Sequence, residues 1–199
     1  SSGNVGIGTS SPANKLDISA TTWDDGLLIK NTGNFNTAII ADANRSSAGG
    51  AILNLASKWN GTEVAGILFQ AGSDTTNKDD GEIVFRTASA GTPSERMRID
   101  SSGNVLVGKT SPGVINQGGE IHNQGYGAFT VSGNVALYIN RLVSDGELVR
   151  FFQDTNLEGN ISVSGSTVSY NGFTGTHWSR FTDNSKPTIL KGTVLETLD

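Results

Sequence analysis

The sequence predicts an all-β protein built from short strands, and three observations carry that prediction. Short apolar runs rich in β-forming residues recur about every 10 to 16 residues. Residues 51–55 and 83–85 show the period of two that is typical of a half-buried strand. No stretch carries a convincing helical i, i+3, i+4, i+7 pattern, and the best helical candidate is the short C-terminal run 193–199.

The expected strands fall into two sets separated by turn-forming residues. Asn, Asp, Gly and Ser cluster between the runs, at 31–34, 47–50, 60–61 and 80–81. The first set comprises 27–29, 38–40, 51–55, 66–69, 82–85, 97–99 and 105–107. After a Gly-, Gln- and Asn-rich stretch over 116–127, the second set comprises 128–131, 136–140, 148–152, 159–163 and 167–170.

One sequence unit occurs twice. SSGNVGIGTSSP at residues 1–12 matches SSGNVLVGKTSP at residues 101–112, an offset of 100 residues (101 − 1), and VSGNV at 131–135 is a weaker echo. Ser-Gly-Asn favours a tight turn, the next residues favour a short strand, and Ser-Pro ends it. A long repeat in a β-rich chain indicates modules stacked along one axis. We place a boundary near Pro112, between a repeat-bounded shaft module (1–112) and a β-rich distal or neck region (113–199).

Composition excludes several function classes. Hydrophobic residues make up 35% and charged residues 17% of the chain, so one copy has little material for a thick core, which favours an oligomer. The chain has no Cys and two His, and we predict neither a metal nor another cofactor. A net charge of −5 argues against a nucleic-acid partner. No apolar run approaches the roughly 18 residues of a membrane span, so we predict no membrane insertion.

Three segments together resemble phage tail-fibre and tail-spike proteins, especially those of marine and environmental phages. They are the SSGNVGIGTSSP unit, the pair GEIVFRT (81–87) and ERMRIDSSGNV (95–105), and LEGNISVSGSTVSYN (157–171). The third is similar to the stretch that precedes a C-terminal intramolecular chaperone in such fibres. In that family the chaperone is released before a Ser in an SDxRLK-like motif. This chain departs from the motif, because GFTGTHWSRFTDNSKP follows Asn171.

The resemblance implies an elongated, intertwined homotrimeric β-fibre with prism- or sandwich-like modules. Its implied function is structural, in a virion tail outside the cell, where it presents or supports a host-receptor-binding surface. The implied partners are two further copies of the chain, other tail or baseplate proteins, and a host surface glycan or protein receptor. Two alternatives remain: a depolymerase spike that cuts capsule or lipopolysaccharide, and a fibre of a bacterial injection system. We predict that the chain is not an enzyme.

Four aromatic residues are the candidates for carbohydrate contact. An aromatic ring can pack on the apolar face of a sugar, and Asn or Asp side chains can bind its hydroxyls. The alternative, which we favour, is that each Trp packs in a subunit interface or caps a strand. The candidates are Trp59 with Asn60, Trp23 with Asp24, Tyr126 and Trp178.

Other polar clusters are assigned no chemistry. Asp74, Asp79, Asp80 and Glu82 share one loop, but their spacing is not that of an EF-hand, and a solvated turn is the favoured reading over a Ca²⁺ site. A Ser, a His and an Asp occur between residues 177 and 183 without a nucleophile elbow. Paired carboxylates for glycoside hydrolysis have no support from spacing; the residues considered were Asp24, Asp25, Asp42, Glu63 and Glu82.

Overall fold

The structure is a computed structural model that describes residues 3–21, 26–34 and 36–172. The described residues form twelve strands and no helix, so the all-β prediction is confirmed. None of them belongs to a helix that could cross a membrane. The chain divides into two compact units, Ser1–Ser132 and Gly133–Asp199. The helical candidate 193–199 lies outside the described residues.

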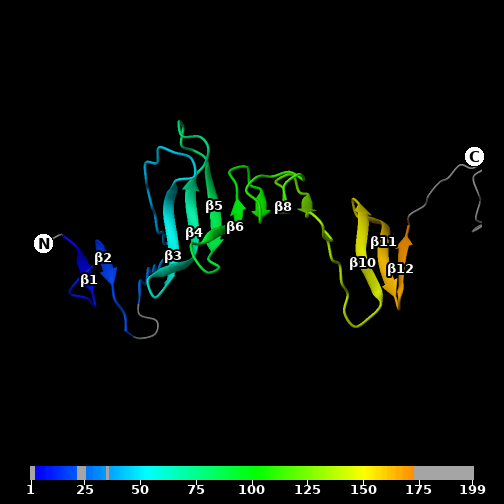
Figure 1. Ribbon diagram of the computed structural model, residues 1–199, viewed down its shortest axis with the longest axis horizontal. Helices are drawn as coiled ribbons and strands as arrows, with labels where there is room; N and C mark the ends of the chain where they lie inside the picture. The colour runs from blue at the N-terminus through cyan, green and yellow to red at the C-terminus, as the bar shows by residue number, and fades with distance from the viewer. Residues whose placement is uncertain (1–2, 22–25, 35, 173–199) are drawn as a thin grey trace, which may run out of the picture. The chain divides into compact units, whose positions relative to one another are not determined.

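The first unit contains a seven-stranded antiparallel meander in which neighbours in sequence are neighbours in the sheet (Figure 1). Its strands are β3 (Ala51–Trp59), β4 (Thr62–Ala71), β5 (Gly81–Thr87), β6 (Ser94–Ile99), β7 (Val105–Val107), β8 (Gly118–Ile121) and β9 (Gly127–Thr130). Before them, β1 (Val5–Ile7) and β2 (Leu16–Ile18) form a two-stranded parallel pair. The predicted boundary near Pro112 falls between β7 and β8, which pair directly.

The second unit contains a three-stranded antiparallel sheet in the order β10-β11-β12. The strands are β10 (Gly146–Gln153), β11 (Asn156–Ser164) and β12 (Thr167–Asn171). Two-residue turns join them, and Asp154 (φ 53°) and Gly165 (φ 57°) open those turns in the left-handed region. Such turns match the natural twist of the flanking strands.

Local turn chemistry fixes the hairpins of the large sheet. Asn60 and Gly61 both have positive φ, 47° and 83°, between the paired ends of β3 and β4. This is the conformation for which an Asn-Gly pair is preferred. Between β6 and β7, the carboxylate of Asp100 accepts hydrogen bonds from the backbone N–H groups of Ser102 and Asn104 and from the side-chain amide of Asn104.

The repeated Asn acts structurally in both copies of the sequence unit. Asn104 is 3% exposed, and its Oδ1 accepts the backbone N–H of Asn123 at 2.9 Å. In the first copy, the side-chain amide of Asn4 donates to the carbonyl of Pro12. In both copies a short strand follows this Asn, β1 and β7 respectively, and in the second copy a turn at Ser101 and Ser102 precedes it.

Three expected strands do not form in the single chain. Residues 27–29, 38–40 and 136–140 carry β-forming side chains, but no strand is assigned to them. A strand is stabilised by a hydrogen-bonded neighbour, and these runs find none among the described residues of the chain. Conversely, β2 and β8 form where no strand was predicted, and β8 lies within the Gly-, Gln- and Asn-rich stretch 116–127.

Candidate self-association surface

The two faces of the seven-stranded sheet differ in chemistry. Residues paired directly in an antiparallel ladder point to the same face. The register therefore places two unbroken rows on one face, which we call the apolar face. The rows are Leu53–Phe69–Ile83–Ile99–Val105–Ile121–Gly127 and Leu55–Ile67–Phe85–Met97–Val107–Gly119–Phe129. Neither row contains a charged residue.

Much of the apolar face is open to solvent in the single chain. The exposed fractions of Phe69, Leu55, Val107, Phe129 and Ile121 are 37%, 47%, 50%, 57% and 62%. A fully exposed aromatic side chain offers about 150–250 Å². These five side chains thus leave on the order of 400 Å² exposed, as much as the largest patch on a typical monomer.

The apolar face is not flat, and it has space that could receive a side chain. A hollow of about 340 Å³ lies over β3, β4 and β5, and its apolar lining includes Leu55, Ile67 and Phe85. At the other edge, the ring of Phe129 lies against Gly119, so closely that a Cβ on Gly119 would be 3.3 Å from two of its ring carbons. Gly119 therefore leaves room for an aromatic ring on this face.

The opposite face carries charged and amide side chains among apolar ones, and we call it the polar face. Its central row is Asn54–Leu68–Val84–Arg98–Leu106–Glu120–Ala128. Among the hydrophobic residues of the described part, Val84 (3% exposed) and Leu106 (0%) are the ones that are buried, and both lie in this row. The small core of the sheet is therefore on the polar face.

A buried ion pair closes the loop after β7 over the polar face. Lys109 Nζ lies 2.7 Å from Glu120 Oε2, and the two side chains are 2% and 0% exposed. The same carboxylate oxygen accepts the backbone N–H of Gly113, and Lys109 Nζ also donates to the carbonyl of Gly113. Hydrogen bonds from Lys109 and then from Gly113 lower the pKa of Glu120 below its ordinary value of 4.5.

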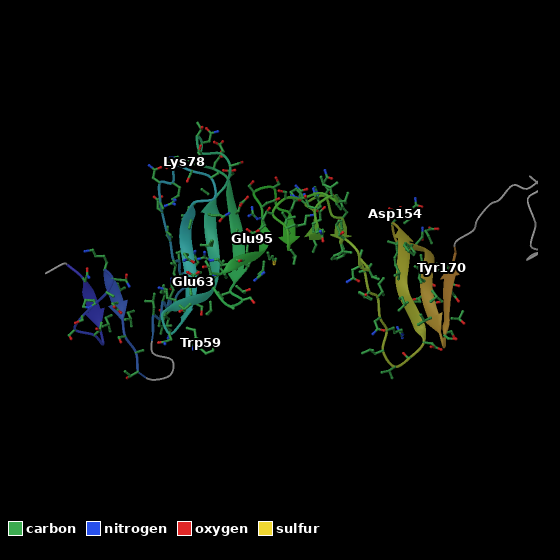
Figure 2. All side chains as sticks on the ribbon, in the orientation of Figure 1. Trp59, Glu63, Lys78, Glu95, Asp154 and Tyr170 are labelled. Atoms are coloured by element: carbon green, nitrogen blue, oxygen red, sulfur yellow. The ribbon has the colours of Figure 1, made fainter. Side chains whose placement is uncertain are left out.

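Arginine side chains hold the carboxylates of β4, β5 and β6 within the same chain. Arg98 lies 2.9 Å from Glu82 and 2.6 Å from Glu95, and Arg86 lies 2.5 Å from Glu63 (Glu63 and Glu95 are labelled in Figure 2). The hydrogen bond from Arg98 to Glu95 raises the pKa of the guanidinium further. Glu63 and Glu82, considered above as paired acids for glycoside hydrolysis, are thus each bound to an arginine.

The acidic loop between β4 and β5 uses its carboxylates to shape a turn. Asp80 accepts the backbone N–H groups of Ser73 and Asp74, and Asp74 accepts those of Thr76 and Asn77. The bonds from Asn77 and Thr76 lower the pKa of Asp74. No group of three or more potential metal ligands occurs in the described part of the chain. The loop also borders a cavity of about 390 Å³ lined by Asp42, Asp74, Asp80 and Lys78.

The predicted carbohydrate contacts do not form one cluster. Trp59, 79% exposed, ends β3 next to the turn residue Asn60 (Figure 2). Tyr126 lies in the turn between β8 and β9, near the other edge of the sheet, and stacks on His122 with ring centroids 4.5 Å apart. Trp23, Asp24 and Trp178 lie outside the described residues, as do Asp25 and the Ser, His and Asp between 177 and 183.

The comparisons with known proteins identify no relative. The chain matches no protein-family model, and no curated protein matches it. The most distinctive feature of the described residues is the pair of unlike faces of the large sheet. Sequence reasoning missed this surface, although the alternation over 51–55, 66–69 and 83–85 already contains its first three strands.

Proposed function

We propose that this chain is a structural segment of a homotrimeric viral tail fibre that presents or supports a host-receptor-binding surface. The observation that carries the proposal is the apolar face, which spans all seven strands of one sheet and which no layer of the described residues covers. Stable domains pack a sheet against a second layer. Three copies can supply that layer for one another by turning their apolar faces inward, with the polar faces outward.

The energies favour association. Burying roughly 400 Å² of apolar surface per copy at about 25 cal/mol per Å² corresponds to about 10 kcal/mol before the cost of association. If the edge strands of neighbouring copies also pair, the assembly removes free sheet edges, which would otherwise template aggregation. The number three, the placement in a virion tail and the contacts with other tail or baseplate proteins rest on the resemblance of the three segments quoted above.

Native mass measured by light scattering tests the self-association. We expect a mass of three chains for the wild type and loss of that mass for Val107→Asp, since a carboxylate would enter the buried interface. Val114→Asp is the matched control, because Val114 is 65% exposed but lies in the loop after β7 rather than on the apolar face. A monomeric wild type, or equal effects of the two substitutions, would overturn the assignment.

Receptor contact is tested separately at the tip of the β3–β4 hairpin. A fibre gains binding strength from several weak contacts acting together, so glycan recognition fits a repeated, exposed aromatic residue. We expect Trp59→Ala to reduce adsorption of the assembled protein to host surface glycans by about tenfold or more, with Tyr126→Ala as a second probe. Unchanged adsorption by both variants would remove these residues as contacts. Shortening of the polymer during incubation would instead favour the depolymerase alternative.

A further inference from the structure

The segment between β9 and β10 has a composition unlike that of an ordinary connection. Residues 135–143 read VALYINRLV, and we call them the connecting segment. Loops and linkers are normally polar, because their side chains stay in water. In the single chain six apolar side chains of this segment are exposed: Val135 53%, Leu137 56%, Tyr138 77%, Ile139 45%, Leu142 76% and Val143 106%.

The backbone of the connecting segment also forms no strand-to-strand hydrogen bonds with the other described residues. No strand is assigned between Val131 and Asp145. Among the described residues, its recorded hydrogen bonds are local: Asn134 Oδ1 accepts the N–H of Val135, the carbonyl of Leu142 accepts from Ser144, and the Arg141 side chain donates to Ser144. The backbone groups of residues 136–140 thus remain available for strand pairing.

The exposed area is large enough for a specific interface. Six side chains at these exposures carry on the order of 700 Å², close to the roughly 800 Å² per partner of a standard interface. The sequence favours a strand there, since four of the nine residues are Val, Ile or Tyr. The segment carries one charge, on Arg141, so the surface that buries it need not be strongly acidic or basic.

We propose that the connecting segment forms a β-strand against a second copy of this chain. The described residues leave a second apolar surface uncovered, the apolar face of the large sheet, and identical copies provide both surfaces in equal number. A closed assembly of copies can therefore cover both at once, which a single foreign partner would not do. This inference rests on the proposed self-association and adds that the connecting segment is part of the interface.

Amide hydrogen exchange read by mass spectrometry tests the proposal on the whole protein. The amides of 136–140 have no backbone acceptor among the described residues of their own chain, so a solvated segment would exchange at nearly the intrinsic rate. We expect exchange slowed by at least about 100-fold in the assembled protein, and loss of that protection on dilution to single chains. The amides of residues 89–92, in the exposed loop between β5 and β6, serve as the unprotected reference.

The outcomes separate this inference from the proposed function. A three-chain mass with rapid exchange at 136–140 would overturn the inference and leave the proposed function standing. A single-chain mass would overturn both. Protection that persists after dilution to single chains would show an intramolecular cover and would also overturn the inference.

A photo-crosslinking residue identifies the covering partner. Tyr138 is replaced by benzoyl-phenylalanine, a change that keeps an aromatic ring at a position that is 77% exposed in the single chain. We expect a crosslinked product of two chain masses after irradiation. The same replacement at Tyr126, which stacks on His122 within its own turn, is the matched control and should give less of that product. Equal yields from the two positions would overturn the proposal.

Discussion

Leu106 and Val107 are neighbours in β7 that face opposite sides of the sheet, and substituting each tests the assignment of the faces. Leu106 is fully buried on the polar face between Arg98 and Glu120, whereas Val107 is 50% exposed on the apolar face. Leu106→Ala should therefore destabilise the fold of each chain. Val107→Ala should mainly weaken the contact between chains.

The expected magnitude follows from what each truncation removes. Leu106→Ala deletes three carbon atoms at about 0.8 kcal/mol each, or roughly 2.4 kcal/mol of transfer free energy, plus a cavity term. The loop after β7 rather than a second layer lies over this face, and it can partly collapse into the cavity. We therefore expect about 2–3 kcal/mol, near the lower end of measured Leu→Ala costs. Val107→Ala should cost less than about 1 kcal/mol in dissociated chains, since half of its side chain is already solvated.

Urea denaturation followed by circular dichroism, at two protein concentrations, measures both effects. With a slope of about 2 kcal/mol per molar urea, Leu106→Ala should lower the midpoint by roughly 1–1.5 M at either concentration. The effect of Val107→Ala should grow with protein concentration, because association contributes more to stability there. A loss below about 1 kcal/mol for Leu106→Ala would refute the placement of the core on the polar face.

Three further outcomes follow from other contacts. The pKa of Glu120 is lower in the folded chain than its ordinary value of 4.5, so its charged form stabilises the fold above pH 4.5. This stabilisation is lost as the pH falls through the lower pKa of the folded state. Glu120→Gln should therefore flatten that part of the curve of melting temperature against pH. Arg98→Met should lower the free energy of unfolding, measured by urea denaturation, by about 1–2 kcal/mol, because it leaves two partly buried carboxylates without their cation. Arg150→Met is the control: its side chain is 60% exposed, and the loss should be less than about 0.5 kcal/mol. Gly61→Ala should lower stability by about 1 kcal/mol through its φ of 83° alone, because nothing lies within 4 Å of the added Cβ.

The sequence predicted most of the strands for which the chain itself supplies the neighbour, although β2 and β8 were not among them. Alternation over 51–55 and 83–85, with an Asn-Gly pair at 60–61, correctly located β3, β5 and the hairpin from β3 to β4. The same β-forming signal at 38–40 and 136–140 was misleading for the single chain. Periodicity reports what a side chain prefers, whereas a strand also needs a hydrogen-bonded neighbour, and that depends on residues far away in sequence.

The polar face could not be predicted from spacing. Lys109 and Glu120 are 11 positions apart, and only the folding of the loop after β7 brings them to 2.7 Å. One signal was available: the first copy of the repeated unit has Thr9 where the second has Lys109. A Lys in place of Thr, within a unit that is otherwise similar in the two copies, indicates that the second copy has a local partner for the positive charge. Of the predicted sugar contacts, Trp59, Asn60 and Tyr126 lie in described parts of the chain, and their role stays a prediction.

Folding and association should be coupled in this protein. A sheet with only Val84 and Leu106 buried among the described hydrophobic residues gains little from folding alone, because most of its apolar side chains remain partly in water. The larger gain comes when the apolar face is covered, so the stability of each chain should depend on how many copies surround it. The buried Lys109–Glu120 pair contributes something different: it fixes the loop after β7 on the polar face and leaves the apolar face clear. The unlike faces of one thin sheet thus explain both why a single chain has a small core and why identical copies would complete it.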